Sequence, residues 1–187
     1  MKKENAIWTF LGIVFFAAVI YLLVKNSDFI SGILYKSGAL APIVAVILYP
    51  LLAPTPLTTD PITVIVGVTY GPFLGAVIAF IGNTLAALVE YFIGIRLGKA
   101  TNFEKNKKKI PFGLGKLPVN SIAFLIVGRM VPGYGGKIIS IMAGTYKVPI
   151  KRYLWTTAVT NLLGSLILAY GAAGFINAIK FSKLFGN

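Results

Sequence analysis

Two parts of the chain repeat one pattern of apolar runs and breaks. Each part contains an apolar run of 14 or 15 residues, a break rich in Pro or Gly, a run of nine apolar residues and a run of 24. The segments are residues 39–53, 54–61, 62–70 and 72–95 in the first part, and residues 118–131, 132–136, 138–146 and 153–176 in the second. Because a helix needs about 20 residues to cross the hydrocarbon core of a bilayer, the two runs of 24 are predicted to span a membrane.

The shorter runs predict two re-entrant hairpins. At about 1.5 Å per residue, nine helical residues reach roughly half way across the hydrocarbon core. Broken backbone at that depth is tolerated only where it is buried in protein or faces a water-filled cavity. We therefore expect each break to be the tip of a hairpin that enters and leaves the membrane on the same side. The break residues are Pro54, Pro56, Pro61, Pro132, Gly133, Gly135 and Gly136.

A further apolar run, residues 7–24, follows Lys2 and Lys3. Its 18 residues exceed the usual apolar region of a signal peptide, and the sequence Lys-Asn-Ser that follows is no small-residue cleavage site. The run therefore predicts a retained transmembrane anchor. The composition agrees, because 57% of the chain is hydrophobic and only 12% is charged, about half the share in soluble domains.

The basic residues predict a topology. Residues 96–116 hold seven Lys or Arg, and Lys147, Lys151 and Arg152 form a second basic cluster. Placing both clusters and the N-terminus in the cytoplasm gives 12 basic residues inside and four outside, which agrees with the positive-inside rule. The two hairpins then enter from opposite faces, and inverted repeats with Pro/Gly breaks near the midplane are typical of transporters.

These patterns predict an all-α integral membrane protein built as an inverted repeat, multi-pass in the plasma or inner membrane of the cell. Residues 1–38 form the N-terminal anchor and an external loop, and residues 39–95 form repeat 1. Residues 96–117 form a basic cytoplasmic loop. Residues 118–187 form repeat 2 and a C-terminal tail.

Charged residues at the breaks are candidates for substrate binding. Asp60 with Pro61 suits the start of a helix, yet a carboxylate at membrane depth is costly and is functional by default. Arg129 precedes the second break, where snorkelling to the interface would be a long reach, and Lys137 follows the glycines. The helices that start after the breaks would also turn unpaired N–H groups towards an anion.

Other polar residues lie within the long runs or directly after them. Glu90, near the expected cytoplasmic end of its helix, and Arg96 are further candidates, although for Glu90 an interfacial position is the simpler explanation. Asn83 and Asn161 are expected to bridge helices.

Several function classes are excluded. The chain has no Cys and no His, and its five acidic residues give no catalytic group, metal site or cofactor site, so an enzyme is not expected. Its net charge of +13 does not indicate nucleic acid, because the basic residues flank apolar runs instead of forming a basic amphipathic face.

The motifs resemble a known family. The stretch Gly-Arg-Met-Val-Pro-Gly at 128–133, followed by Ala143 and Gly144, resembles the second hairpin of the DedA superfamily, also called the VTT-domain or SNARE-associated Golgi protein family. Asp60, seven residues before Gly67, resembles the acidic residue of the first hairpin, and residues 91–98 resemble the Tyr-x-x-Gly-Arg-rich helix end that contains Arg96.

This chain also departs from DedA proper. Gly135 stands where a second arginine is usual, with Lys137 as a substitute, and Ala87 stands in place of an Asp. The chain is therefore similar to the broader VTT group.

The resemblance implies lipid handling: return of polyprenyl phosphates across the membrane, or phospholipid scrambling. We therefore expect a flippase or scramblase whose partners are membrane lipids with anionic headgroups. Arg129 and Lys137 would bind the phosphate, and Asp60 would pair with Arg129 in the empty site and act as a gating or proton-coupling group. An ion-coupled transporter of small solutes and a non-transporting membrane scaffold are the alternatives, and the sequence leaves homo-oligomerisation open.

The topology is testable by cysteine-accessibility labelling in intact cells and inverted vesicles. Single cysteines introduced within residues 98–116 and at Lys151 should label only from the cytoplasmic face, because both segments are basic. Labelling of the two sites from opposite faces would contradict the inverted repeat.

Overall fold

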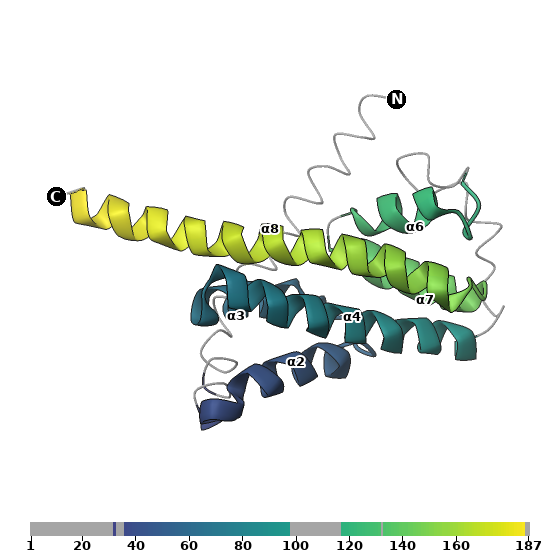
Figure 1. The fold of residues 1–187 in the computed structure, drawn as a ribbon, viewed down its shortest axis with the longest axis horizontal. Coiled ribbons are helices and arrows are strands. Elements are labelled where there is room, and N and C mark those ends of the chain that lie inside the picture. Colours follow the sequence, from purple (N-terminus) through teal and green to yellow (C-terminus); the bar gives the residue numbers. More distant parts are fainter. Residues whose placement is uncertain (1–31, 33–35, 98–116, 132, 186–187) are drawn as a thin grey trace.

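The computed structural model describes residues 32, 36–97, 117–131 and 133–185, and all secondary structure in these residues is helical (Figure 1). The helices are η1 (Gly38–Leu40), α2 (Ala41–Leu52), α3 (Asp60–Tyr70), α4 (Pro72–Leu97), α6 (Ile122–Arg129), α7 (Gly135–Thr145) and α8 (Ile150–Phe185). The expected anchor at residues 7–24 and most of the basic loop lie outside the described residues.

The helix boundaries follow local chemistry. Pro61 lies in the first turn of α3, where its missing N–H costs no helical hydrogen bond. Gly71 ends α3 with a φ of 80°, a conformation that costs glycine little, and Pro72 then opens α4. The side chain of Ser121 caps α6 by accepting a hydrogen bond from the N–H of Phe124 at 3.2 Å.

Three expected boundaries need correction. Pro61 lies inside α3, so the first break is shorter than predicted and comprises residues 53–59. Gly135 and Gly136 form the first turn of α7, so the second break keeps its length but lies two residues earlier, at residues 130–134. The reason is that Pro and Gly are compatible with a first helical turn and do not by themselves place a residue outside the helix. At the other end, α8 continues to Phe185, beyond the apolar run.

Helix lengths separate two classes of element. The 26 residues of α4 and residues 150–172 of α8 are long and apolar enough to cross a membrane. The 12 residues of α2 and the 11 of α3 span only about 18 and 16 Å, against a hydrocarbon core of about 30 Å. Neither short helix is a membrane crossing by itself.

The long helices connect the two repeats. Helix α4 contacts α2 and α3 of its own repeat and α7 and α8 of the other, while α8 contacts α3, α4 and α6. In Figure 1, α4 and α8 run side by side along the molecule. Each long helix therefore packs against the short helix that follows the break in the opposite repeat.

Small residues allow α4 and α7 to approach closely. A Cβ added to Gly94 of α4 would collide with the carbonyl oxygen of Ile141, and a Cβ added to Gly144 of α7 would collide with that of Tyr91. Such backbone contact is typical of helix pairs in membranes, where van der Waals packing replaces the hydrophobic driving force.

The substitutions Gly94→Ala and Gly144→Ala should each lower stability by about 1–3 kcal/mol, because the new methyl group meets backbone that cannot move aside. The measurement is thermal unfolding in detergent. Gly171→Ala is the matched control, since nothing lies within 4 Å of its added Cβ and it should be neutral or slightly stabilising. Equal melting temperatures for all three variants would contradict close α4–α7 packing.

Candidate functional site

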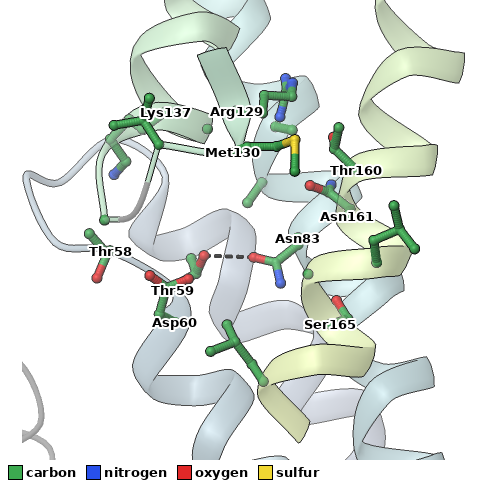
Figure 2. Close-up of a pocket in the computed structure, with 18 of the residues that line it drawn as sticks. Thr58, Thr59, Asp60, Asn83, Arg129, Met130, Lys137, Thr160, Asn161 and Ser165 are labelled. Atoms are coloured by element: carbon green, nitrogen blue, oxygen red, sulfur yellow. Dashed lines mark hydrogen bonds between the residues drawn. The ribbon is translucent and has the colours of Figure 1, made fainter. Parts of the chain in front are cut away.

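A cavity of about 390 Å³ lies between the two breaks, α4 and α8. We call it the inter-break pocket. Its polar lining comes from the first break and from helices α3, α4, α6, α7 and α8, as Figure 2 shows in part, and comprises Thr58, Thr59, Asp60, Asn83, Glu90, Arg129, Lys137, Thr160, Asn161 and Ser165. The pocket therefore brings together four of the five predicted charged candidates from both repeats.

Lys137 connects the second repeat to the first break. Its Nζ donates to the carbonyl oxygens of Thr55 at 2.6 Å, Leu57 at 2.8 Å and Ala53 at 3.2 Å, and lies 3.5 Å from that of Leu52. These carbonyls follow the end of α2, where the last helical carbonyls lack intrahelical partners. An ammonium group has three N–H donors, so the carbonyls of the first break can occupy all of them.

Glu90 is the acidic partner of Lys137. Its Oε1 lies 3.8 Å from Nζ, and its side chain is only 7% exposed. Glu90 is therefore buried within the helix bundle and lines the pocket, seven residues before the end of α4 at Leu97. A buried carboxylate needs a partner, and Lys137 supplies it from the other repeat.

Arg129 ends α6 and is oriented by residues of two other helices. Its Nη2 donates to Oγ of Ser140 on α7 at 2.9 Å, and Ser140 donates in turn to the carbonyl of Gly136 at 2.7 Å. Its Cζ lies 5.1 Å from the ring centroid of Tyr153 on α8, within the range of a cation–π interaction. Nε is buried without a hydrogen-bond partner.

The Tyr153 ring is itself fixed. Its hydroxyl donates to the carbonyl of Ala87 at 2.6 Å, and the ring stacks on Tyr91 with centroids 4.6 Å apart. The hydroxyl of Tyr91 donates to the carbonyl of Val148 at 2.8 Å. Both tyrosines are buried, so the surface under Arg129 is rigid.

Asp60 lies in the first turn of α3 and lines the pocket, but it does not pair with Arg129. Among the described residues, Asp60 makes no ion pair and no side-chain hydrogen bond, and the ion pair in this region joins Lys137 to Glu90. Figure 2 shows Asp60 and Arg129 at opposite ends of the pocket. The expected pair is absent because Ser140 and Tyr153 hold the guanidinium on the side of α7 and α8.

A polar network lies beside Asp60. Thr59 donates to Oδ1 of Asn83 at 2.6 Å, and Nδ2 of Asn83 donates to Oγ1 of Thr63 at 3.4 Å. Nδ2 of Asn161 donates to Oγ1 of Thr84 at 3.3 Å. Asn83 and Asn161 thus bridge helices as expected, while both also line the pocket.

The remaining candidate lies elsewhere. Arg96, in the last turn of α4, is exposed and is not part of the pocket lining. Sequence reasoning missed Ser140 and Tyr153, because a serine and a tyrosine inside apolar runs give no signal without knowledge of which helix faces they occupy. No group of three or more His, Cys, Asp or Glu gathers in the described part of the chain.

Comparison with known families bears on this arrangement. A family model described as VTT domain matches residues 54–173, which include the pocket, the second break and all but the first residue of the first break. Comparison with curated proteins and with solved structures gives no match. The VTT domain is the domain of the DedA and SNARE-associated Golgi proteins, a family of generally non-enzymatic membrane proteins, so the resemblance found in the sequence is confirmed. Because the match covers more than half of the chain, this membrane protein belongs to the VTT-domain family.

Proposed function

We propose that this protein is a lipid translocator that passes an anionic headgroup, such as that of a polyprenyl phosphate, through the inter-break pocket. The observation that carries the proposal is the state of Arg129, a guanidinium in a pocket between two helix breaks that makes no ion pair among the described residues. Glu90, whose charge acts on Arg129 within the same pocket, forms its ion pair with Lys137. An ionised group in such a place requires a counter-charge, and a bound phosphate supplies one.

The proposed anion site includes the side chain of Arg129 and backbone N–H groups at the start of α7. Arg129 carries five N–H donors, of which Ser140 accepts one. The guanidinium lies beside the first turn of α7, where Nη1 is the nearest atom, at 3.9 Å, to a Cβ added on Gly136. Backbone N–H groups of a first helical turn have no intrahelical acceptor and favour negative charge. Arg129 and the start of α7 together suit a phosphate.

Lys137 has a different role from the one first expected. Because its ammonium donates to the carbonyls of the first break and lies near Glu90, it is a structural link, and Arg129 is the principal donor to the headgroup.

In the membrane, we place α2–α3 and α6–α7 as re-entrant hairpins that enter from opposite faces, with the N-terminus in the cytoplasm of the cell. The short α2 and α3, the two long apolar helices and the distribution of basic residues support this arrangement. Lipid tails would remain in the bilayer while the headgroup crosses.

The first test is headgroup translocation in liposomes by purified Arg129→Lys and Arg129→Gln proteins. Both rates should fall at least about tenfold, because an ammonium cannot reproduce the bidentate hydrogen bonds of a guanidinium and charged hydrogen bonds contribute about 1.5–3 kcal/mol. Labelled polyprenyl phosphate, labelled phospholipid and soluble phosphate are tested in parallel.

Arg152→Lys is the matched control, because Arg152 is bonded to Asn120 at the protein surface and should keep the wild-type rate. Wild-type rates from well-folded Arg129 variants would show that Arg129 does not bind the headgroup, whereas absence of lipid movement by the wild type would favour a non-transporting scaffold. Movement of soluble phosphate alone would favour a small-solute transporter.

The second test is pH dependence. An ionised Asp60 repels a phosphate in the same pocket, whereas a protonated Asp60 does not, so the rate should fall as pH rises through the titration of this carboxyl group. Asp60→Asn should remove that fall and leave a high rate at all pH values. If the wild type and Asp60→Asn share one pH profile, Asp60 has no gating or proton-coupling role.

A further inference from the structure

Two buried side chains, Ser140 and Tyr153, contact the guanidinium of Arg129. They can hold it in place without contacting the headgroup themselves. We infer that Ser140 and Tyr153 are positioning residues, which immobilise the guanidinium of Arg129 so that its remaining donors are presented to the pocket in one orientation. The inference rests on the proposed function, in which Arg129 binds the headgroup.

Two contacts from different helices restrict the guanidinium. Ser140, on α7, accepts from Nη2 at 2.9 Å and is held by its own bond to the carbonyl of Gly136. Tyr153, on α8, places its ring 5.1 Å from Cζ. With the hydrogen bond alone, the guanidinium could still rotate about the axis of that bond. With the ring contact alone, it could still slide across the face of the ring. Together the two contacts remove both freedoms.

Further contacts fix these two supports. Ser140 and Tyr153 are fully buried, at 0% exposure. The hydroxyl of Tyr153 is bonded to α4 through the carbonyl of Ala87, and its ring stacks on Tyr91, also of α4. The supports of Arg129 therefore come from helices α4, α7 and α8, and they cannot move without disturbing the contact between the repeats.

The position of Arg129 does not give every one of its N–H donors a hydrogen-bond acceptor. Nε is buried and has no hydrogen-bond partner, which is unfavourable for a charged donor. A buried unsatisfied donor in a native structure requires an explanation, and functional placement is one of the recognised explanations. Here the supports hold the guanidinium although Nε stays unsatisfied, and Ser140 accepts from only one of its Nη donors. A preorganised donor set of this kind loses less conformational entropy when it binds an anion.

The first experiment reads the orientation of Arg129 directly and does not depend on transport. The chain has three arginines, Arg96, Arg129 and Arg152, so NMR of protein labelled with ¹⁵N-arginine gives three Nε–H signals. The signal that disappears in Arg129→Lys belongs to Arg129. It should be shifted upfield by the Tyr153 ring, and the shift should persist in Tyr153→Phe and vanish in Tyr153→Leu. Ser140→Ala should broaden or average the signal.

The second experiment is a double-mutant cycle in the liposome assay. Ser140→Ala and Tyr153→Leu should each lower translocation roughly tenfold, as expected for a lost charged hydrogen bond or desolvated cation–π contact. Tyr153→Phe keeps the ring beside Arg129 and its stacking on Tyr91, so its translocation rate should fall less than that of Tyr153→Leu. In an Arg129→Gln background, the same two substitutions should cause no further loss, because they act through the guanidinium.

Tyr49→Leu is the matched control. Tyr49 is equally buried and its hydroxyl lies 3.2 Å from Oγ1 of Thr63, so its removal tests the general effect of losing a buried tyrosine. Its effect should be the same with Arg129 or Gln at position 129. An unchanged Arg129 signal in Tyr153→Leu, or equal losses from Tyr153→Leu in both backgrounds, would overturn the positioning role. If the wild type moves no lipid, or Arg129→Gln moves it at the wild-type rate, the proposed function fails instead, and the NMR signal still decides whether Tyr153 and Ser140 orient Arg129.

Discussion

The contact of Lys137 with the first break is the interaction on which the rest of the site depends. In the re-entrant arrangement proposed above, the first break lies in the apolar part of the membrane, where water cannot satisfy its carbonyl groups and each unsatisfied group costs several kcal/mol. Lys137 meets these carbonyls from the opposite repeat, while Glu90 on α4 compensates its charge. One ammonium group thereby stabilises the broken backbone of repeat 1 and holds the two breaks on either side of one pocket.

Because Glu90 forms its ion pair with Lys137, Arg129 makes no ion pair among the described residues and can donate to a bound anion. The pocket contains two basic and two acidic side chains, and the pairing of Lys137 with Glu90 leaves Arg129 and Asp60 separated. Ser140 and Tyr153 contact Arg129 without neutralising it. Arg129 would attract an anion that enters the pocket, and an ionised Asp60 would repel it. Close packing of α4 on α7 at Gly94 and Gly144 keeps this geometry rigid.

The fold was largely predictable because the lengths of apolar runs and the Pro/Gly breaks are local signals. They gave the short helices α2 and α3, the long α4 and α8 and the approximate position of both breaks, and the motifs around Asp60 and Arg129 indicated the family. Pairing of side chains was not predictable in the same way. Which charge meets Lys137 depends on how α4 packs against α7, and Ser140 and Tyr153 gain their role only from helix rotation, which run lengths do not specify.

The most direct measurement of the central claim is an experimental structure of the protein with a bound lipid phosphate, such as a short-chain polyprenyl phosphate. We expect the phosphate to lie within hydrogen-bonding distance of the Arg129 guanidinium and the first turn of α7, with Lys137 still bonded to the carbonyls of the first break. A phosphate bound to Lys137 with those carbonyls released, or bound outside the inter-break pocket, would contradict the proposal.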